Sequence, residues 1–349
     1  VPITAKNRKT GIYPYYGANG LQDYVAEYIF DDELVLLAED GGNFGSKERP
    51  IAYRVSGKCW VNNHAHVLKA KPLVNADYLC YALMFYDTEG LVNGATRQKL
   101  TQTAMRQMMI PYRNMTEQLQ IADEINQVIR LIDKRKEELS LLDQLVKSRF
   151  VELFGDPVSN PYSLPEDTLP NLGKFGRGVS KHRPRNDIKL LGGKYPLIQT
   201  GDVANAGLYI TSYSSTYSEL GLKQSKMWEK GTLCITIAAN IAKTAILEFD
   251  ACFPDSVVGF IGNERTNNIF IHYWFSFFQA ILESQAPESA QKNINLKTLS
   301  ELKVIVPEKK KQDQFAAFVA QTDKSKYLFY CLEYIRNNFN AMLEFYMGG

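Results

Sequence analysis

The sequence predicts an α+β fold with an internal pseudo-two-fold repeat, in which two mixed, mostly β domains are separated by two long antiparallel α-helices that form a coiled-coil spacer. The first observation is that landmarks recur in the same order in the two halves of the chain. The recurring landmarks are Tyr13-Pro14 with Tyr195-Pro196, Cys59-Trp60 with Cys252-Phe253, and residues 98–100 with residues 291–294. The second observation is that Pro111 and Pro307 are each followed seven residues later by a glutamine, Gln118 and Gln314, where a long amphipathic run begins. A module used twice explains both observations.

Two amphipathic runs supply the predicted helices. Between Thr116 and Phe154 the apolar residues recur at alternating spacings of four and three, which is typical of a helix packed against another helix. Thr116 is a suitable N-cap, and Gly155-Asp156-Pro157 places a flexible residue and then a helix breaker at the other end. The run from Gln312 to Met347 repeats the apolar seam less regularly. Neither seam is stable in water, so we expect each to be buried against the other.

The rest of the chain consists of short β-like runs bounded by Gly, Asn and Pro, with one apolar helix near the end of each domain, at residues 76–86 and 269–282. These patterns divide the chain into a first domain at residues 1–110, a central helix at 111–155, a second domain at 156–306 and a C-terminal helix at 307–349. Only 12 residues precede Tyr13 in the first domain, whereas 40 residues, from Gly155 to Lys194, precede Tyr195 in the second. We therefore expect the first domain to lack an opening segment. The chain opens without a Met, which predicts a processed or truncated product.

Composition argues against a membrane or secreted protein. No run reaches the roughly 18 apolar residues of a membrane helix, and no secretory signal is present. The five cysteines show no CxxC spacing and are typical of reduced core thiols, so we expect a cytoplasmic protein. The net charge of +2 is unevenly placed, because the two helical runs are acidic. The domains are therefore more basic than the whole chain, which slightly favours anionic ligands.

The sequence contains no convincing catalytic or metal-binding constellation. His64 and His66 are two residues apart and have no matched third ligand. The glycine-rich segment 173–178 lacks both the preceding hydrophobic strand and the acidic partner of a nucleotide-binding loop. Asn160-Pro161-Tyr162 lacks the second proline of an amino-methyltransferase motif. We therefore predict a chain that is not an enzyme by itself and that holds no metal and no cofactor.

Basic loops with glutamine or asparagine recur at matching places in both domains. Residues 97–99 and 291–293 each combine Gln with basic residues, and residues 174–185 form a denser basic loop. Lys and Arg can contact phosphates, whereas Arg, Asn and Gln carry the paired donors and acceptors that distinguish guanine and adenine. One such loop is more often a solvated turn. Because the pattern recurs, a nucleic-acid surface and a solvated turn are about equally good interpretations.

Several motifs resemble the specificity subunits of type I restriction–modification systems. The resemblance is carried by residues 13–20 (Tyr-Pro-Tyr-Tyr-Gly-Ala-Asn-Gly), 36–41 (Leu-Leu-Ala-Glu-Asp-Gly) and 60–68 (Trp-Val-Asn-Asn-His-Ala-His-Val-Leu). The junction from Pro111 to Gln118 with Ile121, and the helix end at residues 148–157, extend it to nearly the whole chain and both repeats. The second domain departs more from the pattern, at Tyr195–Ile198 and Cys252–Ser256.

This resemblance implies a DNA-binding subunit whose two domains are target-recognition domains, each reading one half-site of a bipartite target. Methyl transfer and ATP-driven cleavage, with S-adenosylmethionine, ATP and Mg²⁺, would belong to two modification and two restriction subunits. In the first domain the residues expected to contact double-stranded DNA are Lys6, Arg8, Tyr15, Tyr16, Asn19, Asn43, Lys47, Arg97, Gln98 and Lys99. In the second domain they are Arg177, Lys181, His182, Arg183, Arg185, Gln199, Thr200, Lys223, Lys226, Gln291, Lys292 and Asn293.

Two other functions remain open at this point. A solitary or phase-variable specificity protein would serve a methyltransferase alone, and only its partners would differ. A two-headed protein scaffold held by a coiled coil would not require DNA binding that weakens steeply with salt, as a DNA-reading subunit does.

Overall fold

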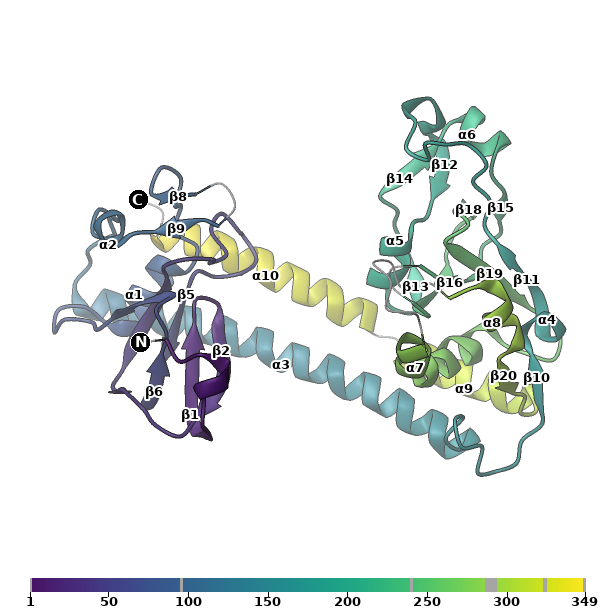
Figure 1. Ribbon diagram of the computed structural model, residues 1–349, viewed down its shortest axis with the longest axis horizontal. Helices are drawn as coiled ribbons and strands as arrows, with labels where there is room; N and C mark the ends of the chain where they lie inside the picture. The colour runs from purple at the N-terminus through teal and green to yellow at the C-terminus, as the bar shows by residue number, and fades with distance from the viewer. Residues whose placement is uncertain (1, 95–96, 239–240, 286–293, 323–324, 348–349) are drawn as a thin grey trace. The chain divides into compact units, whose positions relative to one another are not determined.

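The computed structural model describes residues 2–94, 97–238, 241–285, 294–322 and 325–347 (Figure 1). The backbone forms two compact units. Unit 1 comprises Val1–Glu138 with Tyr327–Gly349, and unit 2 comprises Leu139–Lys326. The division falls inside one helix, α3 (Met115–Phe154), whose first part belongs to unit 1 and whose last part belongs to unit 2.

Unit 1 is built on a four-stranded and a three-stranded sheet. The four-stranded sheet has the order β2-β1-β6-β3 and the other has the order β5-β4-β7. The central strand β4 has the sequence Leu-Val-Leu-Leu-Ala and is buried along its whole length, as expected for a continuous apolar run covered on both faces. The bounds are β1 (Thr10–Gly17), β2 (Gly20–Val25), β3 (Phe30–Asp31), β4 (Leu34–Ala38), β5 (Ala52–Val55), β6 (Lys58–Val61), β7 (Ala65–Leu68), β8 (Val92–Asn93), β9 (Lys99–Leu100) and the 3-10 helix η1 (Ala5–Asn7).

Unit 2 repeats this plan with a longer second sheet. Its four-stranded sheet has the order β14-β12-β18-β15, and its five-stranded sheet has the order β11-β19-β16-β17-β13. A further pair joins β10 to β20. The bounds are β10 (Glu166–Thr168), β11 (Gly173–Arg177), β12 (Leu191–Leu197), β13 (Tyr209–Ile210), β14 (Ser215–Tyr217), β15 (Met227–Trp228), β16 (Leu233–Thr236), β17 (Thr244–Leu247), β18 (Ala251–Cys252), β19 (Val257–Gly262), β20 (Lys303–Ile305) and the 3-10 helix η2 (Ile188–Leu190).

The strand pairings confirm the predicted duplication. In both four-stranded sheets the Tyr-Pro strand, β1 or β12, pairs in parallel with the strand that carries the Cys landmark, β6 or β18. Each of these strands also has one antiparallel partner on its other side. In the second sheet, β4 and β16 are both flanked by two antiparallel strands. Unit 2 adds β10, helix α4 and β11 ahead of β12, whereas the described residues before β1 contain only η1.

The apolar helix predicted in each domain is present. It is α1 (Ala76–Met84) in unit 1 and α7 (Asn268–Gln285) in unit 2. The shorter helices are α2 (Gln102–Met105), α4 (Leu169–Leu172), α5 (Thr200–Asn205), α6 (Glu219–Lys223) and α8 (Leu296–Glu301).

The boundaries of the long helices differ from the predicted ones. Helix α3 begins at Met115, and its N-cap is Asn114 instead of Thr116, because the Asn114 side chain accepts the amide of Glu117 at 3.0 Å. The predicted C-terminal end is confirmed: Gly155 follows the helix with a φ of 75°, which favours glycine. The second run forms two helices, α9 (Lys309–Thr322) and α10 (Ser325–Met347), where one helix was predicted.

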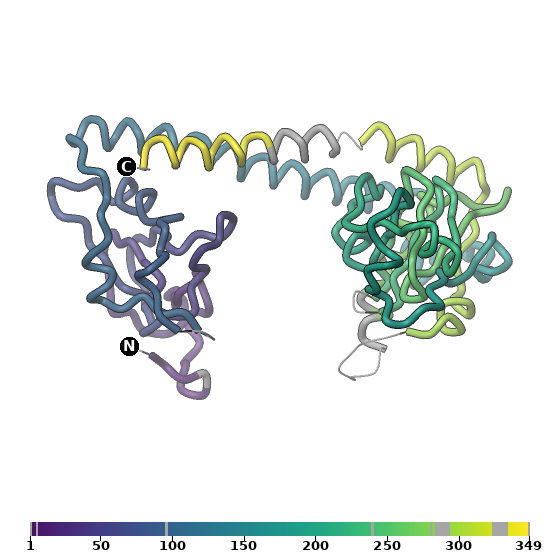
Figure 2. Tube along the Cα trace, turned by 90° about the horizontal axis from the view of Figure 1, so that it is seen from above, coloured from purple at the N-terminus to yellow at the C-terminus, as the bar shows by residue number. Residues whose placement is uncertain are grey.

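The predicted burial of the seams is confirmed at Ile125 and Val146, whereas Ile132 and Leu139 are only half-buried, and the seams also contact the domains themselves. In unit 1, α10 runs antiparallel beside the first part of α3 (Figures 1 and 2), and Ile125 joins one apolar cluster with Phe339 and with Tyr78 of α1. In unit 2, Val146 of α3 joins a cluster with Phe315 of α9 and with the apolar side chains of α7. Phe329, another predicted partner, has a side chain outside the described residues. Two arginines occupy positions in the apolar seam of α3, and each pairs with an acid three residues later on the same helix: Arg135 with Glu138 and Arg149 with Glu152.

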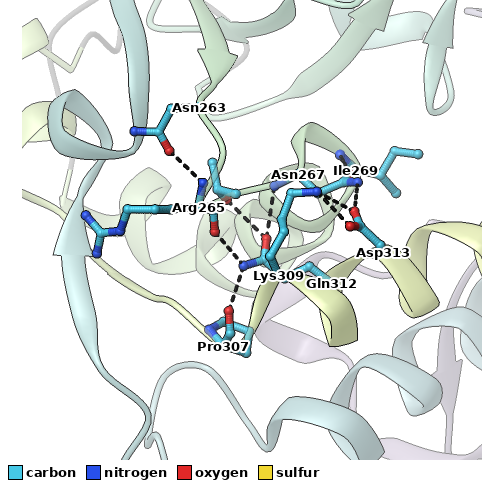
Figure 3. A network of polar contacts seen from close by, with 9 residues as sticks. Asn263, Arg265, Asn267, Ile269, Pro307, Lys309, Gln312 and Asp313 are labelled. Atoms are coloured by element: carbon cyan, nitrogen blue, oxygen red, sulfur yellow. Dashed lines mark hydrogen bonds and ion pairs between the residues drawn. The ribbon is translucent and has the colours of Figure 1, made fainter.

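A buried glutamine joins each long helix to the apolar helix of its own domain. In unit 1 the Gln118 side chain accepts the backbone amide of Asn75, at the start of α1, and donates to the carbonyls of Leu73 and Arg113. In unit 2 the Gln312 side chain accepts the amide of Asn267 and donates to the carbonyls of Arg265 and Pro307 (Figure 3). The two patterns match. Each glutamine donates to the carbonyl of the residue five positions before it. Each also donates to a carbonyl two positions before the residue whose amide it accepts.

These contacts correct the predicted register of the repeat. Gln312, not Gln314, is the counterpart of Gln118, because Gln118 and Gln312 are 1% and 0% exposed whereas Gln314 is exposed. The segment between the proline and the helix is two residues shorter in the second copy. Counting seven residues from Pro307 therefore selected a surface residue.

Candidate nucleic-acid interface

In unit 1, the three loops that the sequence assigned to DNA contact lie next to one another. The side-chain amide of Asn19 donates to the carbonyl of Gly41 at 3.0 Å. The backbone amide of Gly41 in turn donates to the carbonyl of Gln98 at 3.1 Å. The loop after β1, the loop after β4 and the residues around β9 therefore form one surface. We call residues 17–19, 40–47 and 97–99 surface 1.

Two carboxylates at the end of β4 orient the cations of surface 1. Asp40 pairs with Arg97, and Glu39 lies 3.1 Å from the ammonium group of Lys99. The Arg97 and Lys99 side chains nevertheless remain 60% and 50% exposed. The carboxylates therefore hold these cations in place, partly neutralise them and leave them accessible from the solvent.

The two histidines beside surface 1 fix its loops. His64 Nδ1 lies 3.0 Å from Asp40, and His66 Nε2 lies 2.8 Å from the carbonyl oxygen of Leu100. Across the described ranges of the chain, no group of three His, Cys, Asp or Glu side chains is placed to hold a metal ion.

The aromatic residues of β1 have structural roles that the sequence did not reveal. Tyr15 is only 1% exposed, and its ring lies under the guanidinium of Arg8 at 4.3 Å. Arg8 also pairs with Asp23 at 3.2 Å. Tyr15 is thus a core residue, and its assignment to DNA contact is corrected. Tyr16 is half-buried and packs against Tyr53, and burial raises its pKa.

The remaining predicted residues of the first domain are mostly on the surface. Lys6 and Lys47 are exposed, whereas Asn43 is half-buried and its side chain donates to the carbonyl of Pro50.

In unit 2, Gln224 connects two of the predicted basic segments. Its side-chain oxygen accepts the backbone amides of Lys181 at 2.7 Å and His182 at 3.0 Å. Lys223 is exposed at the end of α6. Lys226 lies over the ring of Trp228 at 3.8 Å, and burial with the nearby charge of Lys174 lowers the pKa of Lys226. Arg177 is exposed at the end of β11.

Nearby carboxylates neutralise much of the basic run from Lys181 to Arg185. Asp255 pairs with both Arg183 and Arg185. His182 Nε2 lies 3.0 Å from Asp187. The backbone amide of Lys189 and the His182 side chain lower the pKa of Asp187, which favours its charged form. The run is therefore less positive than its sequence suggests, and sequence reasoning missed Asp255, which follows the Cys252 landmark by three residues.

A cavity of about 250 Å³ lies beside this run. The predicted residues Arg185, Gln199 and Thr200 line it. Sequence reasoning missed its other polar lining residues, which are Ser180, Asn186, Ser215 and Ser256, and the aromatic residue Tyr217. Asn186 could have been found because it directly follows the basic run. The serines and Tyr217 lie in separate segments that no local pattern connects. Gln291, Lys292 and Asn293 lie outside the described residues.

Comparison with known proteins identifies the family. The family model for the type I restriction modification DNA specificity domain matches residues 1–141 and 171–336, which together make up most of the chain. The chain belongs to this family. It is a type I specificity subunit with two DNA-recognition domains.

Known relatives agree with this membership. The chain is similar to S.HindORF215P of Haemophilus influenzae, assigned as a type I restriction enzyme specificity subunit, with 26% identity over 323 residues that cover 91% of this chain and 82% of that protein. It is also similar to the Escherichia coli type I restriction enzyme EcoprrI specificity subunit, with 30% identity over 81 residues, 23% of this chain and 19% of that one.

Solved structures share the fold. The crystal structure of a type I restriction-modification S subunit from M. genitalium matches with a TM-score of 0.59 and 16% identity over 98% of this chain and 91% of that one. A chain from a study of complex assembly and conformational transition in the type I R-M system matches with a TM-score of 0.53 and 13% identity, over 97% and 92% of the two chains. Among the helices described in this chain, none is long and apolar enough to span a membrane.

Proposed function

We propose that this specificity subunit reads a bipartite DNA target, one half-site per recognition domain, and positions the modification and restriction subunits on it. The observation that carries the proposal is that the duplication extends to a detail of the polar interior. Both units share the parallel pairing of the Tyr-Pro strand with the Cys strand, and both have a buried glutamine between the long helix and the domain helix. Two domains built alike and attached alike are suited to two equivalent tasks.

The chemistry of the loops supports DNA as the ligand. Surface 1 presents Arg97, Gln98 and Lys99, and the cavity of unit 2 presents Asn186 and Gln199. Arginine pairs with the two acceptors of guanine, asparagine and glutamine pair with adenine, and lysine neutralises phosphate. Surface 1 therefore combines groups that position a duplex with groups that distinguish its bases, and the cavity of unit 2 adds groups of the second kind.

Catalysis would belong to the partners. We propose that this chain is not catalytic and holds no cofactor. Two modification subunits would bind S-adenosylmethionine, and two restriction subunits would use ATP and Mg²⁺. Helix α3 supports a docking role, because Leu131, Leu141 and Leu145 are 40%, 55% and 48% exposed on it.

The test is to co-express the chain with its modification subunit and map methylated adenines. We expect two short half-sites separated by a fixed number of unread base pairs, with one methylated adenine on each strand. A single continuous motif, or binding to target DNA that does not weaken as salt rises, would contradict the proposal.

A second test concerns the length of the spacer. Inserting four residues after Leu139 lengthens a helix by about 6 Å, equivalent to roughly two base pairs of B-DNA. It rotates the following part by only about 40°, so the apolar seam is nearly kept. We expect a longer gap with unchanged half-sites. Retained methylation with the original gap would show that the helices do not set the spacing.

A further inference from the structure

The cavity in unit 2 has a lining that a nucleobase would fit. We propose that it is the base-reading pocket of this unit: it receives the edge of one base of the second half-site, and Ser180, Asn186 and Gln199 determine which base is accepted. This inference rests on the proposed DNA-reading function and locates the part of that function that unit 2 performs.

The lining favours a neutral, flat ligand that has hydrogen-bonding groups along its edge. The apolar part of the wall comes from Leu191, Leu197, Tyr217 and Pro254. The polar part comes from neutral side chains, namely Ser180, Asn186, Gln199, Thr200, Ser215 and Ser256. The one charged side chain in the lining, Arg185, is already paired with Asp255. A phosphate would be held by uncompensated cations, so this composition suits a base better than the DNA backbone.

The size of the cavity agrees with a small planar group. Its volume of about 250 Å³ is below the roughly 300–1,000 Å³ typical of pockets for larger organic ligands. One base, or the edge of one base with a bridging water, is of the right scale.

Ser180 provides an independent sign that a ligand belongs here. The residue is only 6% exposed, and its hydroxyl oxygen has no hydrogen-bond partner within the part of the chain that the structure describes. Its backbone is held in place, because its carbonyl accepts the guanidinium of Arg183 at 2.6 Å. A buried hydroxyl without a partner is unfavourable for the free protein. A base that supplies a donor or acceptor would relieve that cost in the complex.

The two amide residues are held on fixed backbone. The backbone amide of Gln199 donates to Asp202 at 2.8 Å, at the start of α5. Asn186 lies between Arg185 and Asp187, which are anchored by Asp255 and His182 respectively. Asparagine and glutamine side chains can pair with adenine through two hydrogen bonds. Because their backbones are anchored, they can discriminate bases without first ordering a loop.

The experiment uses the full chain with its modification subunit and begins with the target mapped for the wild type. Ser180→Ala and Gln199→Ala are compared with Asn205→Ala, a matched exposed control on α5 outside the cavity lining. Arg97→Gln, on surface 1, marks the half-site read by unit 1. Binding is measured by competition between the mapped duplex and duplexes with one base pair changed, and the melting temperature of each variant is recorded.

In the two cavity variants we expect the preference for the correct base pair over a changed one to fall by about 5- to 150-fold at one position. That position should lie in the half-site that Arg97→Gln leaves unchanged. Asn205→Ala should match the wild type. Ser180→Ala should melt at the same temperature as the wild type or higher, because it removes an unpartnered hydroxyl. A merely structural role for Ser180 would instead lower the melting temperature and leave discrimination intact.

Two results would overturn the inference. The first is uniform weakening of binding to all sequences by Ser180→Ala and Gln199→Ala, with base preference retained at every position. The second is an equal loss of discrimination in Asn205→Ala. A wild-type chain that produced no bipartite motif would refute the proposed function itself, which is a separate outcome.

Discussion

Gln312 gives the most direct prediction about how a recognition domain is attached to its helix. The side chain is fully buried and makes four hydrogen bonds, two as a donor to the carbonyls of Arg265 and Pro307 and two as an acceptor from Asn267 and Thr266. Gln312→Ala leaves these groups without their partner. An unpaired buried polar group costs about 1–3 kcal/mol. Some of these groups can regain water, so we expect a total loss of about 3–5 kcal/mol in the free energy of unfolding of unit 2.

Such a loss is large compared with the roughly 5–15 kcal/mol that stabilises a typical domain. Gln118→Ala removes three hydrogen bonds of the same kind in unit 1. We expect a loss of about 2–4 kcal/mol there. The exposed residue Gln314 provides the matched control in the same helix, and Gln314→Ala should change the stability by less than about 0.5 kcal/mol.

Tryptophan fluorescence can follow the two units separately during urea unfolding. Of the three tryptophans, Trp60 lies in unit 1 and Trp228 and Trp274 lie in unit 2. In a Trp60→Phe background the signal reports unit 2 alone. If Gln312→Ala and Gln314→Ala unfold at the same urea concentration, the buried glutamine does not stabilise this junction.

Three further outcomes follow from the charges of the structure. Burial lowers the pKa of His272 to about 4, so the fold favours its neutral form. The free energy of unfolding of unit 2 should therefore fall by up to about 3 kcal/mol as the pH drops from 6.5 to 4. In urea unfolding, His272→Gln should flatten this pH dependence. Asp255→Asn should release Arg183 and Arg185, strengthen binding to any DNA at low salt and steepen the salt dependence, whereas the exposed control Glu264→Gln should not. Lys99→Gln should weaken binding to all sequences alike and reduce the slope of log affinity against log salt concentration by about 0.9. Arg97→Gln should instead cost about 1–3 kcal/mol of binding free energy at one base position. Equal effects of the two variants on every sequence would contradict these separate roles.

The helices and the duplication could be predicted because their signals are periodic or repeated. The apolar spacing from Ile121 to Leu153 is long enough to define a helix without tertiary information. The N-cap was misplaced by two residues because Asn114 and Thr116 are both good capping residues, and the choice depends on where the chain leaves the domain. The equivalence of Gln118 and Gln312 depends on which glutamine reaches a buried helix start, and counting from the proline cannot show this.

The candidate site could be predicted only as a set of loops. Sequence identified segments such as Arg97–Lys99 and Gln199-Thr200, and the structure brings neighbouring predicted segments together in each unit. Sequence could not show that Tyr15 faces the core, because alternating residues of β1 differ in burial and either face could have been the outer one. The acids that compensate the arginines were missed for a related reason: Asp255 is about 70 residues from its partners, and only the folded chain brings them together.

These compensating acids bear on how a specificity subunit discriminates. Non-specific affinity for DNA comes mostly from cations that neutralise phosphates. In both units the best-placed arginines are instead paired with carboxylates: Arg97 with Asp40, and Arg183 and Arg185 with Asp255. Under the proposed function, an arginine has to leave its carboxylate in order to contact a base. The correct base offers it two hydrogen bonds in return, whereas an incorrect base offers only a poor contact. This arrangement lowers affinity for all DNA and raises the difference between sequences. The affinity given up in this way has to come from elsewhere in the complex, and partner subunits docked on the helices would supply it.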